Sequence, residues 1–406
     1  MKNIFIIFFA SFLLFSCQYG HKSEKSQRLA DDALTKSLEL AYRKDGIRGF
    51  SVAVVDEKGL VYNKGFGFAS LDQIKAYTAH STQNIASISK TLIGVALLKA
   101  QELGKLNIND PINDYLPFKV VNPHYPEIPI LIKHLAYHTS SINDLDEVYA
   151  KSYVLSKDQH DENEGVYDYF NKPETHISLK DFMLNSLTQG GKWYQKSTFL
   201  DSKPGEKREY SNIGAALCAL VIESAVEQDY RIFTRNYIMQ PLEMNSSGWS
   251  VGDIDSLGRS RLFAYKGKMI AEYSLITYAD GGLVTSSHDM GLFLSELIKG
   301  CNGSGKLLTK ESYNTLFEKQ RFIDQDETEE YGVFMEFRND FLQVKNDMIG
   351  HNGSDPGVFT AMYFNPTTKV GKVVLVNTDT DFTDIVWPEI EEIWKSLSDY
   401  ESMISK

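Results

Sequence analysis

One serine and one lysine stand at a spacing that suits nucleophilic chemistry. Ser87-Ile88-Ser89-Lys90 is the only S-x-x-K tetrad in the 406-residue chain. Residues i and i+3 share one face of a helix, so the Lys90 amine is expected beside the Ser87 hydroxyl. A serine hydroxyl is a weak nucleophile until a base takes its proton, and a desolvated lysine with a lowered pKa is able to do so. The tetrad therefore predicts Ser87 as the nucleophile of a covalent mechanism.

The residues around the tetrad distinguish this interpretation from an ordinary helix surface. Most S-x-x-K matches are solvated, because serine and lysine are common. Here Ile85-Ala86 precede the tetrad and Thr91-Leu92-Ile93-Gly94 follow it, so Lys90 is expected to be buried. A buried lysine needs a specific reason. The alternative, a secreted globular protein in which the tetrad has no function, predicts that Ser87→Ala leaves every activity unchanged.

A phenol and an amide occur together at Tyr210-Ser211-Asn212. Such side chains are able to relay a proton and to hold a substrate carbonyl. Two further Y-x-N tripeptides, at 169–171 and 363–365, show that the pattern alone is weak. The one at Tyr210 follows the turn Pro204-Gly205-Glu206 and precedes an apolar helical run, which favours Tyr210 and Asn212 as site residues.

Residues 350–357, Gly-His-Asn-Gly-Ser-Asp-Pro-Gly, form a glycine-rich segment beside a predicted strand. Backbone without side chains approaches a ligand closely and offers its N–H groups. Ser354, His351 and Asp355 do not make a local triad, because neighbouring side chains on extended backbone point to opposite faces. The segment also lacks the G-x-S-x-G turn of a nucleophile elbow.

His134 and His138 are four residues apart and could share a helix face as metal ligands. Neither H-E-x-x-H nor a nearby carboxylate pattern accompanies them. Helix capping or hydrogen bonding in the core is the favoured interpretation.

Strand patterns lie near both ends of the chain and helical patterns lie between them. From about 130 to 245 no strand periodicity is convincing, and the polar stretch 156–164 has the composition of an exposed insertion. This order predicts an α/β (α+β) fold with one sheet built from both termini and an inserted, mostly helical lobe at about 90–250. The expected strands are 49–55, 60–62, 331–337, 358–364 and 370–376, and the expected helices include 30–43, 90–106 and 385–396.

The N-terminus has the shape of a secretory signal. Met1-Lys2-Asn3 precede an apolar run, Ile4 to Phe15, which is too short to span a bilayer. The following Ser16-Cys17 resemble a bacterial lipobox, in which Cys17 is lipidated and becomes the new N-terminus. We expect a signal peptide at 1–17, a flexible tether at 18–30 and one folded domain at 31–400. The alternatives are a plain cleaved signal, which would give a secreted protein, and an uncleaved buried helix.

Composition excludes two classes of protein. The net charge is -12 with a pI near 5.3, and the basic residues are scattered, so no surface for nucleic acid is predicted. Beyond Cys17 only Cys218 and Cys301 remain, which is too few for a disulfide framework or a zinc ribbon. Cys218 lies in an apolar run and is expected to pack in the core.

Together these motifs resemble the serine β-lactamase and penicillin-binding-protein family, in particular its class C-like serine hydrolases, from about residue 31 to 400. Two positions depart from the pattern of that family. His351 stands where the third motif usually has lysine, and Ser141 stands where the family usually has glycine. The matching blocks are 85–91 around Ser87, 106–117, 134–140, 204–214 around Tyr210, 281–286 and 351–353.

The resemblance implies a β-lactamase-like antiparallel sheet flanked by helices, and an acyl-enzyme on Ser87. Lys90 and Tyr210 would serve as base and proton shuttle, in an order that the sequence leaves open. Asn212 would orient the substrate. The backbone N–H groups of Ser87 and Ser354 would form the oxyanion hole, with His351, Asn352 and Gly353 also lining the substrate site. No metal or organic cofactor is implied.

The function predicted is that of a serine hydrolase acting on small esters, D-amino-acid or cell-wall peptides, or β-lactams. Because a neutral His351 supplies no cation for a substrate carboxylate, peptidase or esterase action is at least as well supported as antibiotic destruction. The alternative is a non-catalytic sensor that binds penicillin or peptidoglycan. The expected protein is a monomer of the bacterial cell envelope, bound to the membrane only through lipidated Cys17, with a small-molecule or peptide substrate and no nucleic acid.

Overall fold

The computed structural model describes residues 25–42, 46–70, 74–156, 170–254, 258–264, 268–322, 330–380 and 385–405. The predicted signal peptide, Cys17 and the first part of the predicted tether lie outside the described residues. So does nearly all of the polar stretch 156–164. No helix in the described ranges is long and apolar enough to cross a membrane.

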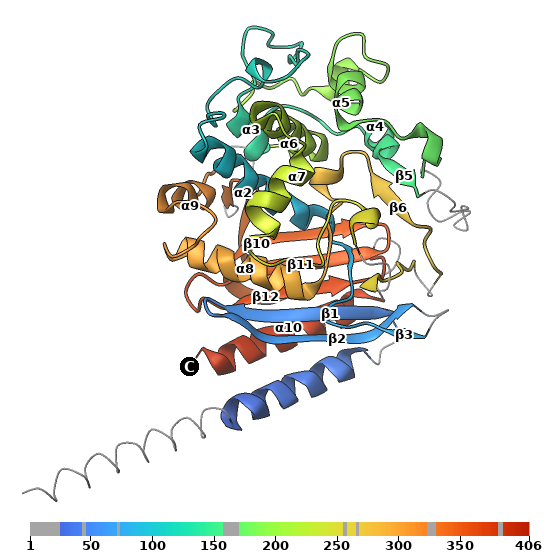
Figure 1. Ribbon diagram of the computed structural model, residues 1–406, viewed down its shortest axis with the longest axis vertical. Helices are drawn as coiled ribbons and strands as arrows, with labels where there is room; N and C mark the ends of the chain where they lie inside the picture. Colours follow the sequence, from blue (N-terminus) through green and yellow to red (C-terminus); the bar gives the residue numbers. More distant parts are fainter. Residues whose placement is uncertain are drawn as a thin grey trace, which may run out of the picture.

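An eight-stranded antiparallel sheet joins the two ends of the chain, in the order β3-β2-β1-β12-β11-β10-β9-β8 (Figure 1). Phe50 of the first strand lies opposite Val376 of the last. The prediction of one sheet built from both termini is therefore confirmed. Its strands are β1 (Gly49–Asp56), β2 (Gly59–Ser70), β3 (Lys75–Ala76), β8 (Glu330–Gly332), β9 (Met335–Phe341), β10 (Val344–Asp355), β11 (Val358–Phe364) and β12 (Gly371–Val376).

Helices cover both faces of this sheet (Figure 1). On one face, the helix at 25–42 and α10 (Trp387–Ile404) bury an apolar cluster that includes Leu38, Phe50 and Trp394. A buried ion pair, Lys372 Nζ to Glu401 at 2.6 Å, ties α10 to the sheet. On the other face, α8 (Ser287–Cys301) and the helical lobe enclose the larger core.

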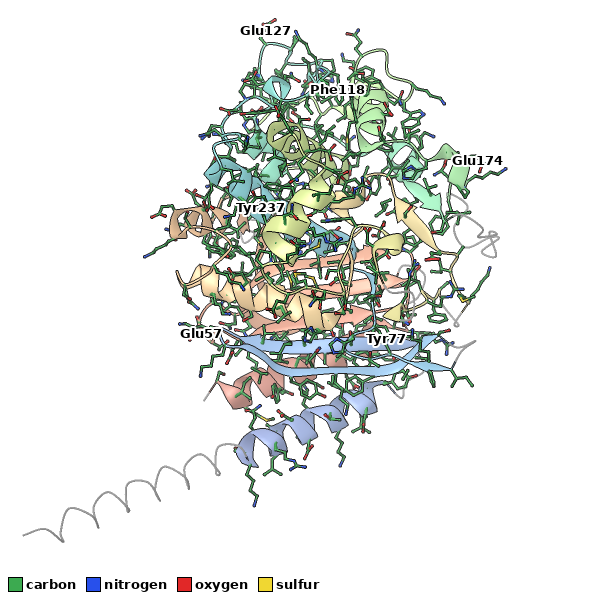
Figure 2. All side chains as sticks on the ribbon, viewed as in Figure 1. Glu57, Tyr77, Phe118, Glu127, Glu174 and Tyr237 are labelled. Atoms are coloured by element: carbon green, nitrogen blue, oxygen red, sulfur yellow. The ribbon has the colours of Figure 1, made fainter. Side chains whose placement is uncertain are left out.

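Two helices that are apolar on all sides form the centre of the lobe. α2 (Ser89–Glu102) and α6 (Asn212–Val226) are buried over nearly their whole length and pack against each other, as expected of central helices. Cys218 of α6 is buried, as predicted. Figure 2 shows Phe118 and Glu127 at the end of the lobe farthest from the sheet. The other elements are α3 (Ile132–Ala136), α4 (Asp146–Tyr149), α5 (Leu179–Leu187), α7 (Tyr230–Thr234), α9 (Lys310–Leu316) and the short strands β4 (Gln83–Asn84), β5 (Tyr153–Leu155), β6 (Tyr273–Leu275) and β7 (Val284–Thr285).

Several predicted boundaries differ from the structure. The first helix already includes residue 25, so 25–30 are not tether, because the Gln27 amide bonds both Asp31 and Tyr400. The predicted strand 331–337 is two strands, since Phe334 turns the chain at a φ of 52°. A strand, β5, lies in the region predicted to have none. It pairs with β6 over three residues, too few for a periodic pattern.

Ser141, the departure from the family's glycine, has a strained backbone. Its φ is 62°, in the left-handed region that favours glycine. Its side chain is buried, and the hydroxyl finds no hydrogen-bond partner among the described residues. A buried hydroxyl without a partner is destabilising.

Ser141→Gly should therefore stabilise the fold by about 1 kcal/mol, because it removes both the left-handed strain and the unpaired hydroxyl. Thermal or urea unfolding measures the change. Ser152→Gly is the matched control, because Ser152 is also buried with an unpaired hydroxyl but is absent from the residues with positive φ. A Ser141→Gly variant no more stable than wild type would contradict this account.

Candidate active site

Ser87 lies at the junction of the sheet and the lobe, in a 3₁₀ turn, Ala86–Ile88, that leads into α2. Its Oγ is 3.0 Å from Lys90 Nζ and 2.9 Å from the Tyr210 hydroxyl. The turn is strained at Ala86, whose φ is 49°. The structure thus brings together the three residues that the sequence singled out, although 123 positions separate Ser87 from Tyr210.

Lys90 is fully buried, and its three N–H bonds are matched by three acceptors. They are Ser87 Oγ at 3.0 Å, Asn212 Oδ1 at 2.7 Å and the backbone carbonyl of Asp280 at 2.7 Å. Three acceptors suit an ammonium, which carries three hydrogens and no lone pair.

The pKa of Lys90 differs in direction from the sequence prediction. Burial lowers the pKa, as expected, but the charges of Tyr210 and Asp280 and a hydrogen bond with Tyr210 outweigh burial and raise it above the ordinary value. Lys90 therefore rests as a cation. Burial raises the pKa of Tyr210, although the neighbouring Lys90 charge opposes this shift.

Asp144 holds Tyr210 and Asn212 in place by capping α6. Its carboxylate accepts from Ser211 Oγ at 2.6 Å and from the backbone N–H of Asn212 at 2.5 Å and of Ile213 at 3.2 Å. A carboxylate at a helix N-terminus is stabilised by these donors and by the helix dipole. No local sequence pattern marks Asp144, because its partners lie 67 to 69 positions along the chain.

The orientation of the Asn212 amide follows from its contact with Lys90. The ammonium can only donate, so the oxygen must face it and the NH₂ group points elsewhere. Asn212 is only partly buried. Its NH₂ group is therefore able to donate to a ligand carbonyl.

The two histidines have structural roles, as predicted. His134 Nδ1 accepts from the backbone N–H of Leu131 at the start of α3, and His138 Nδ1 accepts from Ser211 N–H. The His138 ring stacks on Tyr210 with centroids 4.6 Å apart. Burial lowers the pKa of both, that of His134 to about 4. Within the described ranges, no three His, Cys, Asp or Glu side chains are grouped to hold a metal ion.

Gly353 allows β10 to approach the nucleophile. A Cβ at this position would lie 2.6 Å from Ser87 N and 2.8 Å from Ala86 Cβ. Thr360, opposite Gly353 on β11, donates from its hydroxyl to the Ile85 carbonyl at 2.7 Å. The edge of the sheet and the nucleophile turn are thus in direct backbone contact.

The side chains flanking Gly353 lie on two faces. His351 is buried with its ring 6.3 Å from that of Tyr210, and its Nδ1–H donates to the Asn352 carbonyl at 2.5 Å. Asn352 points to the other face, where its Oδ1 accepts from Tyr363 at 3.0 Å. Ser354 is exposed, and its hydroxyl lies 3.3 Å from that of Thr380. The substrate contacts predicted for these residues stay predictions.

The environment of His351 makes it a poor cation. Burial lowers its pKa, although Glu336, with Oε1 3.9 Å from His351 Nε2, opposes this. Glu336 is itself engaged by Arg338 at 2.9 Å and by the Tyr363 hydroxyl at 2.8 Å. His351 is therefore neutral near pH 7, as the sequence suggested.

Two buried acids on the other side of Lys90 were missed by the sequence analysis. Asp355, also on β10, accepts from the Tyr153 hydroxyl at 2.6 Å. Asp280 is fully buried in a 3₁₀ turn, Tyr278–Asp280. A charged residue between Ala279 and Gly281-Gly282-Leu283 was the available signal for Asp280, since its neighbours are small or apolar.

A G-x-S-x-G spacing elsewhere, at 248–252, does not form a second nucleophile. Ser250 precedes the short turn Val251–Asp253, and its backbone N–H donates to the Asp253 carboxylate at 3.1 Å. Ser250 therefore belongs to a local loop.

Comparison with known proteins agrees with this geometry. The family model described as Beta-lactamase matches residues 30–392, most of the chain. The chain belongs to the Beta-lactamase family. Members of this family are generally serine hydrolases, and the β-lactamase-like fold predicted from the sequence is confirmed.

Three similar proteins give the range of the family. Protein flp of Staphylococcus aureus (strain N315) is 24% identical over 362 residues, which cover 87% of this chain but only 65% of that protein, less than two thirds of its length. An octameric penicillin-binding protein homologue from Pyrococcus abyssi superimposes with a TM-score of 0.68 at 21% identity, over 92% of this chain and 76% of the other. D-amino acid amidase from Ochrobactrum anthropi SV3, in complex with L-phenylalanine amide, gives 0.66 at 18% identity, over 90% and 99%.

His134→Asn should make the fold of this Beta-lactamase family member less sensitive to acid. A histidine whose folded pKa of about 4 lies below its ordinary 6.5 contributes stability above pH 6.5 that is lost as the pH falls towards 4. Asparagine keeps an acceptor for Leu131 N–H but does not titrate. The drop in melting temperature between pH 7 and pH 4.5 should shrink in the variant. His80→Asn, at an exposed position, is the control, and an unchanged drop in His134→Asn would refute the prediction.

Gly353→Ala should reduce turnover at Ser87 by at least about 100-fold, because the added methyl group pushes β10 away from the nucleophile. The rate of ester hydrolysis measures the loss, and circular dichroism reports whether the fold persists. Gly252→Ala is the matched control, since a Cβ there meets nothing nearer than Ser250 Oγ at 3.7 Å. Equal losses in both variants would show that the contact between Gly353 and Ser87 has no special role.

Proposed function

We propose that this protein is a serine hydrolase that forms an acyl-enzyme on Ser87 and cleaves small esters or amides, including those of D-amino acids. The observation that carries the proposal is the pair of hydrogen bonds at Ser87 Oγ, from Lys90 at 3.0 Å and from Tyr210 at 2.9 Å. A hydroxyl contacted by two titratable groups has a route for its proton as it attacks a carbonyl.

In this mechanism Tyr210 accepts the proton of Ser87. Lys90 has all three hydrogens engaged and a raised pKa, so it acts as a cation that stabilises a Tyr210 phenolate. The two groups interact strongly enough that one proton is lost from the pair rather than from either residue alone. Tyr210 then returns its proton to the leaving group, and water repeats the cycle on the acyl-enzyme.

The oxyanion that forms during attack is assigned to two backbone donors, the N–H groups of Ser87 and Ser354. The close packing of Gly353 on Ser87 N supports this assignment, because it brings that part of β10 beside the nucleophile. Preorganised N–H donors of this kind lower the barrier by about 3 kcal/mol each. The Asn212 NH₂ group would hold the acyl carbonyl, and the β10 edge from His351 to Ser354 would line the substrate.

The charges favour a substrate without a carboxylate next to the reacting bond. The third motif offers a neutral His351 rather than a fixed cation, and Asp280 and Asp355 flank Lys90. An acidic site repels an acid and accepts a neutral ester, a neutral amide or an amine-bearing acyl group. The amide in complex with the structurally similar D-amino acid amidase is a ligand of the latter kind.

We further propose that the protein works at the bacterial cell envelope, with Cys17 as its lipid anchor, and is secreted if Cys17 is not lipidated. Metabolic labelling with an alkynyl fatty acid, compared with Cys17→Ser, tests this. The oligomeric state is open, because one structural neighbour is described as octameric. A monomer is our working proposal.

Ser87→Ala should abolish hydrolysis of p-nitrophenyl acetate and of D-phenylalanine amide, with a loss of at least about 10³-fold. Ser89→Ala is the matched control, because it removes a hydroxyl two positions away that accepts from Leu283 N–H. The mass of the intact protein, before and after substrate, detects the acyl-enzyme.

The same experiment, repeated with a fluorescent penicillin, separates this proposal from the sensor. A stable adduct on Ser87 without release of product would favour a non-catalytic penicillin- or peptidoglycan-binding sensor. Turnover that survives Ser87→Ala would overturn both the nucleophile and the proposed function.

A further inference from the structure

Asp280 is the buried acid that the chemistry above leaves without a role. It is fully buried at the end of the turn Tyr278–Asp280, which packs against α2 and α6. Its backbone carbonyl accepts from Lys90 Nζ at 2.7 Å. Neither of its carboxylate oxygens has a hydrogen-bond partner of good geometry among the described residues. Buried carboxylates are seldom left in this state without a function.

The charges around Asp280 connect it to Lys90. Burial is the main effect on its carboxyl and raises the pKa to about 8, while Lys90 acts in the opposite direction. Thr277 and the N–H groups nearby provide too little stabilisation to offset burial. The other titratable groups that face Asp280 are Asp355 of β10, Asp144 before α4, Tyr149 of α4 and Tyr153 of β5.

Lys90 is the one cation among these groups. The acids that face it are Asp280, Asp355 and Asp144, and Tyr210 and the neutral His138 and His351 complete its surroundings. Of the acids, Asp280 has the strongest effect on Lys90. Its carbonyl also fixes the position of the ammonium, so one residue sets both the place and the charge of Lys90.

We propose that Asp280 is a positioning residue that holds Lys90 as an ammonium and thereby sets the pH at which the Lys90–Tyr210 pair becomes able to take the proton of Ser87. The proposal rests on the proposed function. A negative carboxylate near the pair opposes the loss of a proton from it, whether that proton leaves Lys90 or Tyr210. Removing the carboxylate must therefore make the pair competent at lower pH.

The test is the pH dependence of kcat/KM for p-nitrophenyl acetate in wild type and Asp280→Asn. Asparagine has nearly the same shape and retains the backbone carbonyl, so Lys90 keeps its position. The rising, acidic limb of the profile should move to lower pH by about one unit. A residue that only supports the fold would lower the rate at every pH and leave the midpoint of that limb in place.

Asp289→Asn is the matched control. Asp289 is a buried acid in the first turn of α8, and its carboxylate accepts from Ser246 N–H at 2.7 Å and Ser247 Oγ at 2.8 Å, away from Lys90. Its loss should change stability without moving the midpoint. If Asp280→Asn is too unstable to assay, Asp280→Ser removes the same charge with a smaller side chain and is expected to show the same shift.

The outcomes separate this inference from the function on which it rests. A profile of Asp280→Asn that superimposes on the wild type, while Ser87→Ala is inactive, would overturn the role of Asp280 and leave the hydrolase proposal in place. A shift in Asp280→Asn that Asp289→Asn does not share would support the role. Turnover that survives Ser87→Ala would overturn both.

Discussion

The site is organised around one buried charge, the Lys90 ammonium. Removing a cation from water is costly unless its hydrogens find acceptors, and breaking a buried charge pair costs about 3–5 kcal/mol. Lys90 avoids this cost through acceptors on Ser87, Asn212 and Asp280, which come from the start of α2, the start of α6 and the turn before β7. Because each acceptor must be in place to satisfy the same cation, Lys90 links three segments that are distant in sequence.

A second constraint fixes the sheet against this centre. Gly353 lets the backbone of β10 reach Ser87 N, and Thr360 of the neighbouring strand bonds the carbonyl of Ile85. β10 is in turn held in a sheet whose other half comes from the N-terminal part of the chain. The helical lobe supplies the nucleophile and its proton partners, whereas the sheet supplies the edge along which a substrate would lie. Neither part makes a site without the other.

The sequence predicted what local spacing encodes. The i to i+3 relation placed Lys90 beside Ser87, the strand patterns at both ends predicted the shared sheet, and the turn before Tyr210 distinguished it from two other Y-x-N tripeptides. Contacts between distant segments were beyond such reasoning. Asp144 caps α6 from 67 positions away, and the split at Phe334 depends on a single left-handed residue. The direction of the Lys90 pKa was wrong for the same reason, since burial is legible in an apolar run but the carboxylates that face the lysine are not.

The charge distribution of the site gives the departures from the family pattern a common physical meaning. With histidine in the third motif, the one cation close to Ser87 is Lys90, and acids surround it. Such a site has no spare positive charge with which to bind a substrate carboxylate, because Lys90 is already engaged by three acceptors. The positive charge thus serves proton transfer instead of recognition. Recognition is left to the Asn212 amide and the backbone of β10, groups that bind a carbonyl equally well in an ester and in an amide.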